Sequence, residues 1–242
     1  MQCRRSRVVF GEKGFLNFFV FINFKMDKIE QIISILKRNY SKFRTPIVTE
    51  FAERTRDPFK VLISCLLSLR TKDDVTAKAS LRLLKGNRTP EKVLKLSVKK
   101  IEKLIYPVGF YRTKARRIKE ISKVLIDKYK SKVPKDFDEL MKLKGVGKKT
   151  AAITMVYGHQ KADFIPVDVH VHVIANRLNW VKTKTPDETM DDLMKVVPKR
   201  YWYDLNDLFV QFGQNVCVTI SPKCSICPIN ELCPKVNVTN RR

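Results

Sequence analysis

Residues 143–151 read Leu-Lys-Gly-Val-Gly-Lys-Lys-Thr-Ala, and they are the most informative segment for the fold. One helix is expected to have Pro134 in its first turn and to carry Phe137, Leu140 and Met141. It is expected to end at Leu143, where this segment begins. A second helix is expected to begin after the two glycines, which permit a positive φ and a close backbone approach. The exposed N–H groups at a helix start form an anion site. The stretch therefore predicts two short helices joined by a tight anion-binding turn.

Helical periodicity runs through the rest of the chain, and no convincing alternating strand of useful length is found. Residues 27–39 place their isoleucines and Leu36 on one helical face. Residues 59–69 are almost wholly apolar, which favours a buried central helix. Further helices are expected after a Ser97 cap, over 113–130, after the Thr185-Pro186-Asp187-Glu188 capping box, and over 201–216. The pattern predicts an all-α protein.

The composition points to a polyanionic partner. The 242 residues include 49 Lys and Arg against 24 Asp and Glu, a formal charge of +25. Such a surplus suits nucleic acid, because each phosphate contact releases condensed counterions. A basic surface without such a role, or an anionic membrane surface, is also compatible with the charge alone.

Four of the six cysteines crowd into the last part of the chain, with the spacing Cys-x6-Cys-x2-Cys-x5-Cys. They are Cys217, Cys224, Cys227 and Cys233. Such a local cluster favours a metal site over a secreted disulfide framework. Zinc sites usually show two close cysteine pairs and here there is one, so the spacing favours a 4Fe-4S cluster over zinc.

The N-terminus carries three arginines within residues 4–7 and an apolar run over 15–24. This outline is similar to that of a signal peptide, but a small-residue cleavage site is missing and the run is too short to span a bilayer. We therefore expect residues 1–25 to be a disordered extension and the protein to be cytoplasmic.

A third motif reads Val167-Asp168-Val169-His170. An Asp that opens a helix is most often only an N-cap. His170 and His172, two residues apart, would point to different faces of a helix, so a metal site there is disfavoured.

These three motifs, in this order and spacing, resemble the endonuclease III family of helix–hairpin–helix DNA glycosylases over about residues 27–235. The resemblance implies two helical domains flanking a DNA-binding cleft. One is a six-helix barrel over 49–161 with the hairpin at about 138–157, and the other combines 26–48 with 162–242 around one 4Fe-4S cluster. It implies catalysis by Lys149 and Asp168, and phosphate binding by Gly145, Val146, Gly147 and Lys148.

The chain departs from the family pattern near the DNA. Arg70 stands where relatives commonly have a glutamine that fills the hole left by a flipped base, and Phe110 stands where a leucine often wedges the other strand. Lys223 is the one cation between the first two cysteines of the cluster. These three residues are expected to contact DNA, and the changes leave the preferred base open. A Phe buried under a loop is the alternative for Phe110.

The resemblance implies a monomeric, nucleoid-associated enzyme of base excision repair that acts on double-stranded DNA with damaged bases or abasic sites. It would remove oxidised pyrimidines and cut the strand by β-elimination through a Lys149 Schiff base. A monofunctional mismatch glycosylase, which generally lacks the lysine, is the nearest rival. A non-enzymatic helix–hairpin–helix protein, which would need neither Lys149 nor Asp168, is a rival of another class.

Overall fold

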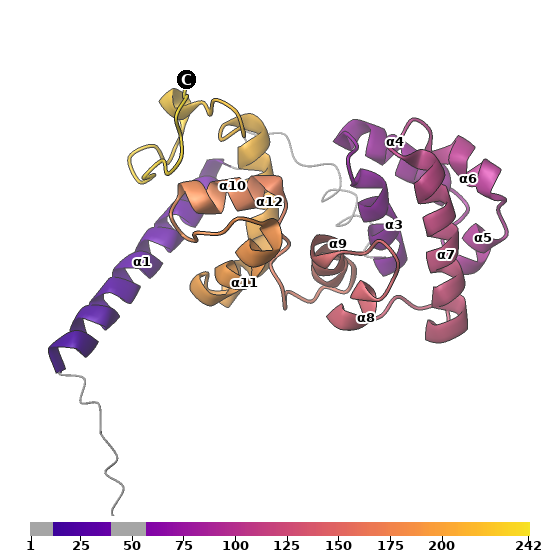
Figure 1. Cartoon of the computed structure of the whole chain (residues 1–242), viewed down its shortest axis with the longest axis horizontal. Coiled ribbons are helices and arrows are strands. Elements are labelled where there is room, and N and C mark those ends of the chain that lie inside the picture. The colour runs from indigo at the N-terminus through magenta and orange to yellow at the C-terminus, as the bar shows by residue number, and fades with distance from the viewer. Residues whose placement is uncertain (1–11, 40–56) are drawn as a thin grey trace, which may run out of the picture.

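The structure, a computed structural model, describes residues 12–39 and 57–242, with side chains from residue 26 onward in the first range (Figure 1). Every regular element in these ranges is helical, which confirms the all-α prediction. The helices gather into two groups, which we name the first and second lobes (Figure 1). The first lobe comprises α3 (Pro58–Ser68), α4 (Asp73–Leu84), α5 (Pro90–Leu94), α6 (Val98–Ile105), α7 (Tyr111–Tyr129), α8 (Phe137–Met141), α9 (Lys148–Ile153) and the π-helical turn η2 (Thr154–Gly158). The second lobe comprises α1 (Glu12–Asn39), α10 (Val169–Arg177), α11 (Pro186–Val196), α12 (Trp202–Asn215) and the 3-10 turns η3 (Lys199–Tyr201) and η4 (Cys224–Ile226).

The first lobe is built around α3, which contacts α4, α7, α9 and η2. Eight of its eleven residues, Phe59 and Val61–Leu67, are buried, as the apolar run predicts. Asp57 caps this helix by accepting hydrogen bonds from Phe59 N and Lys60 N, and Pro58 follows at the first helical position, where it needs no donor. A helix that is buried over most of its length thus lies at the centre of the lobe.

The second lobe joins distant parts of the sequence. Ile29, Ile32, Ile33 and Leu36 of α1 are almost completely buried in one hydrophobic core with residues of α10, α11 and α12. Phe137 and Phe164 stack with ring centroids 4.0 Å apart and pack against the cores of both lobes. Helix α1 therefore shares its core with helices from the C-terminal half of the chain, and the expected domains stay a prediction.

Two local expectations differ from the structure. Pro134 lies outside the first turn of α8, because Asp136 accepts a hydrogen bond from Glu139 N (2.9 Å) and caps the helix there. Helix α1 begins at Glu12, so part of the expected extension is helical, and residues 1–11 lie outside the described range. Across the residues that the structure describes, no helix is both long and apolar enough to cross a membrane.

Candidate active site

The turn between α8 and α9 has the form that its glycines predict. Gly145 adopts a φ of +86°, a left-handed conformation that favours glycine, and a Cβ there would displace the flexible Arg117 side chain. Gly147 caps α9 with a φ of −101° and faces open space. Val146 is buried in the core of the first lobe, so only its backbone is left to meet a ligand. This exposed turn at the start of α9 suits an anion.

Lys149 and Asp168 come from different lobes and face each other. Lys149 lies in the first turn of α9, and Asp168 is the N-cap of α10. The distance from Lys149 Nζ to Asp168 Oδ2 is 3.6 Å, and the side chains are 38% and 12% exposed. An amine that meets a carboxylate at a partly open site has a proton acceptor within reach.

The two oxygens of Asp168 have separate roles. Oδ1 accepts hydrogen bonds from His170 N (2.9 Å) and Val171 N (3.0 Å), which caps α10. Just before it, the carbonyl of Pro166 accepts a hydrogen bond from the buried Asn206 Nδ2 (2.8 Å). The capping bonds fix the carboxylate so that Oδ2 is directed at Lys149. Asp168 is therefore a helix cap and also the partner of the lysine.

A pocket between the lobes contains this pair. From the first lobe it is lined by Ser68, Thr71, Asp73, Lys149, Ile153 and Tyr157, and from the second by residues that include Asp168, His170, Asn206 and Gln214. Cys65 lies near Lys149, but burial raises the pKa of its thiol to about 12. This cysteine therefore stays protonated and does not compete as a nucleophile.

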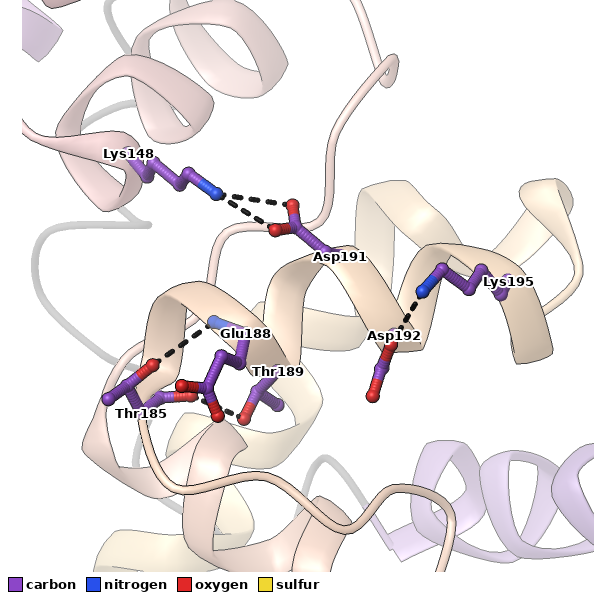
Figure 2. Close-up of polar contacts among 7 residues, drawn as sticks. All are labelled: Lys148, Thr185, Glu188, Thr189, Asp191, Asp192 and Lys195. Atoms are coloured by element: carbon purple, nitrogen blue, oxygen red, sulfur yellow. Dashed lines mark hydrogen bonds and ion pairs between the residues drawn. The ribbon is translucent and has the colours of Figure 1, made fainter.

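Lys148, the neighbouring lysine, is directed elsewhere (Figure 2). Its Nζ lies 3.0 Å from Asp191 Oδ2 and 3.3 Å from Asp191 Oδ1, on α11 of the second lobe. The expected phosphate contact of Lys148 therefore competes with an ion pair between the lobes. The sequence does not mark Asp191 as the partner of Lys148, because α11 carries several acidic residues and no motif distinguishes this one.

Arg70 and Phe110 lie side by side on two turns of the first lobe, and we name this pair the Arg70–Phe110 tip. The Arg70 guanidinium carbon lies 5.7 Å from the centroid of the Phe110 ring, and both residues have positive φ, 51° and 56°. Phe110 is 62% exposed, so the alternative of a buried Phe under a loop is wrong. An arginine over an exposed aromatic ring forms a combined apolar and cationic surface.

The four clustered cysteines line a single pocket of the second lobe, together with Lys223 and Arg177. Burial raises the pKa of the Cys217 and Cys233 thiols, and raises that of Cys227 to about 11. Arg177 Nη1 donates to Cys217 Sγ (3.2 Å) and to the carbonyls of Cys217 and Val218. Buried thiols that need a positive charge to ionise, and an arginine already donating to one of them, suit a metal-containing group.

No motif in the sequence marks Arg177, Asn206 or Asp191. Arg177 closes α10 and also donates from Nη2 to Thr219 O (2.6 Å), so it holds the loop that carries the first cysteine. A single arginine near a helix end has many ordinary uses, and only packing shows this one. The roles of Lys149, Asp168, Arg70, Phe110, Lys223 and the cysteines stay predictions.

Comparison with known proteins places the chain in a family. Residues 63–199 match the model of the HhH-GPD superfamily base excision DNA repair protein. The chain is 46% identical to "Endonuclease III" of Thermotoga maritima over 73% of this chain and 83% of that protein. It is 42% identical to "Endonuclease III-like protein 1" of Mus musculus over 73% of this chain and 59% of that protein.

A solved structure of a trapped endonuclease III–DNA covalent intermediate shares the fold. It has a TM-score of 0.74 and 33% identity over 86% of this chain and 96% of that one. The family model and the identity over most of the chain together establish the relationship. The chain belongs to the endonuclease III family, within the HhH-GPD superfamily of base excision DNA repair proteins, whose members are DNA glycosylases.

Proposed function

We propose that this glycosylase is bifunctional: it removes oxidised pyrimidines from double-stranded DNA and then cleaves the abasic strand through a Schiff base on Lys149. The observation that carries the proposal is the 3.6 Å approach of Lys149 Nζ and Asp168 Oδ2 in a pocket between the two lobes. The family relationship supports the choice of oxidised pyrimidines.

The reaction begins with base flipping, because the glycosidic carbon of a stacked nucleotide is out of reach of a protein side chain. The neutral amine of Lys149 attacks C1′, the bond from C1′ to the base breaks, and the base leaves. Lysine in water is protonated at neutral pH, so the amine must first lose a proton. Asp168 Oδ2 is placed to accept that proton, or to stabilise the positive charge that develops on the sugar.

Strand cleavage follows from the covalent intermediate. The bond from C1′ to the ring oxygen O4′ then breaks as O4′ takes a proton, which leaves a protonated imine between Lys149 and C1′ and makes the C2′ proton acidic. Removal of that proton drives the electrons toward C3′, and the bond from C3′ to its phosphate oxygen breaks. Water then releases the sugar aldehyde and restores the amine. This sequence needs an amine at position 149 and no second nucleophile.

DNA binding is proposed to use three surfaces of the molecule. The Gly145–Gly147 turn offers backbone N–H groups to a phosphate. Arg70 and Phe110 enter the duplex at the space that the flipped nucleotide leaves. The charge of +25 supplies sequence-independent attraction along the backbone. We propose that the enzyme acts as a monomer.

We also propose that Cys217, Cys224, Cys227 and Cys233 hold one 4Fe-4S cluster. All four line one pocket, and their spacing in the sequence contains one close cysteine pair, where zinc sites usually have two. A larger group fits that spacing better than zinc. When bound, the cluster supplies the positive charge that ionises the buried thiols and ties the C-terminal loop together, and neither hydrolysis nor elimination requires electron transfer.

The decisive test is borohydride trapping on abasic DNA with Lys149→Gln. The variant is expected to lose covalent trapping and strand cleavage while it keeps DNA affinity, because it loses one cation among 49 basic residues. Lys148→Gln is the matched control, since its amine faces Asp191. Trapping at the wild-type rate by Lys149→Gln would instead assign the reaction to another lysine.

A further inference from the structure

Two turns of the first lobe carry the Arg70–Phe110 tip, and neither turn is regular. Residues 69–72 connect α3 to α4 and contain Arg70 at a φ of 51°. The turn after α6 ends at Phe110, which has a φ of 56° and directly precedes α7. Non-glycine residues rarely adopt this left-handed conformation, and they hold it only where the surroundings fix it.

The two turns are tied to each other. Gly109 N donates a hydrogen bond to Thr71 Oγ1 (3.1 Å). A Cβ at position 109 would lie 2.5 Å from the Arg70 carbonyl oxygen, so the backbones meet at van der Waals distance and only glycine fits. The guanidinium of Arg70 then lies over the Phe110 ring.

Lys114 lies directly beneath this junction. It belongs to the first turns of α7, four residues after Phe110, and is only 9% exposed. Its Nζ donates to Leu67 O (2.8 Å), Leu69 O (2.5 Å) and Thr71 Oγ1 (3.2 Å). An ammonium group has three donors, and all three are used on uncharged acceptors, one in α3 and two in the α3–α4 connection.

This arrangement costs free energy that a structural cap alone would not require. Lys114 forms no ion pair with a carboxylate of the described residues, so its loss of hydration is uncompensated by charge, and burial lowers its pKa to about 8. A helix C-terminus is commonly satisfied by water, by glycine or by an exposed side chain. Here the Lys114 side chain of α7 instead donates hydrogen bonds to the C-terminal end of α3 and to the turn that contains Arg70.

We propose that Lys114 is a positioning residue for base excision, which holds Arg70 and Phe110 in one rigid tip that enters the duplex. Lys114 lies four residues after Phe110 in the sequence. Two of the residues that accept its hydrogen bonds, Leu69 and Thr71, are the immediate neighbours of Arg70. Lys114 therefore fixes both partners of the tip relative to each other. Because a flexible tip would spend binding free energy on becoming ordered, preorganisation speeds flipping.

The inference rests on the proposed entry of the tip into DNA, and Lys114→Met tests it while keeping the length of the side chain. Two measurements are made. One is the fluorescence of 2-aminopurine placed opposite a tetrahydrofuran abasic analogue, which rises when the tip unstacks that base. The other is the single-turnover rate of excision of thymine glycol from a duplex, compared with β-elimination at a preformed abasic site.

Lys114→Met is expected to reduce the 2-aminopurine signal at saturating protein and to slow excision by about tenfold, with elimination changed by less than about twofold. Lys119→Met is the matched control, since Lys119 lies on the same helix and donates to a single carbonyl, Leu96 O (2.7 Å), away from the tip. Lys114→Gln, which keeps two donors, is expected to lie between Met and the wild type.

A double-mutant cycle distinguishes positioning from general stability. If Lys114 acts through the tip, Lys114→Met adds little to the loss that Phe110→Ala already causes. Additive losses, or equal falls in excision and elimination that follow a lower melting temperature, would overturn the inference. An unchanged fluorescence signal in Lys114→Met would overturn it too. A wild-type protein that excises no base but still gives the 2-aminopurine response would count against the proposed function alone.

Discussion

Asp168 has one oxygen in a helix cap and the other toward Lys149, and two substitutions separate these roles. Asparagine keeps an oxygen that can accept both backbone hydrogen bonds, and it is as good an N-cap as aspartate. Alanine removes the cap and the charge together. Both variants remove the negative group that faces the amine.

The stability change follows from these contacts. Asp168→Asn removes a charge at a helix N-terminus, which contributes about 0.3–1 kcal/mol to the free energy of unfolding. It also removes an ion pair with a partly exposed lysine, which contributes at most about 1 kcal/mol. Asp168→Ala loses in addition a cap of about 1 kcal/mol. Asp168→Asn should therefore unfold at a lower urea concentration than the wild type, and Asp168→Ala at a lower concentration still.

The excision rates, in contrast, should be alike in the two variants, because both lose the carboxylate that faces Lys149. Loss of a group that accepts a proton or stabilises charge slows a reaction by about 10²–10⁴, which corresponds to roughly 3–5 kcal/mol in the barrier. Single-turnover excision of thymine glycol from a duplex should fall by this factor in both variants, with DNA affinity unchanged or increased. Wild-type excision by Asp168→Asn would refute the chemical role, and a rate loss confined to the alanine variant would reduce Asp168 to its cap.

Phe110→Ala should slow excision from duplex DNA by about ten- to a hundredfold, because stacking on a base contributes roughly 1–3 kcal/mol; its melting temperature should be unchanged, since the ring is 62% exposed, and a large fall would contradict this. The purified protein should be yellow-brown with equal iron and sulfide, and a colourless, fully active protein with one zinc would exclude the cluster. Lys114 has a folded-state pKa of about 8 against 10.5 for an unperturbed lysine, so between these pH values only the unfolded state binds its proton. The unfolding free energy of the wild type should therefore rise relative to that of Lys114→Met by up to about 3 kcal/mol from pH 8 to 10.5, and a flat difference in urea titrations would show that Lys114 is hydrated.

Local signals in the sequence predicted most of the helices. Ser97 and Thr185 cap α6 and α11 as expected, by accepting hydrogen bonds from Lys100 N and Glu188 N. These features depend on neighbours in the chain, so they can be recognised without a fold. The prediction that Pro134 lies in the first turn of α8 was wrong, because a proline can occupy a first turn but does not by itself begin a helix. Asp136, two residues later, is the N-cap that begins α8.

The candidate site was predicted less completely, because its contacts cross between elements. The sequence motifs indicated Lys149 and Asp168. The ion pair of Lys148 with Asp191 and the buried hydrogen bonds of Lys114 join residues far apart in the chain, so no sequence motif predicts them. The exposure of Phe110 also needed the structure, since a Phe after a glycine suits a core and a surface equally well.

The sequence alone determined that two basic residues begin the helix after Gly145 and Gly147, and that four cysteines lie within one short segment. The packing of the helices sets the direction in which each of these lysines points. Successive residues of an α-helix are turned by about 100°, so Lys148 and Lys149 cannot point the same way. The burial of Thr150, Ala151 and Ala152 fixes the rotation of α9. That packing directs Lys148 to Asp191 and leaves Lys149 facing the pocket, where its amine meets the carboxylate of the other lobe.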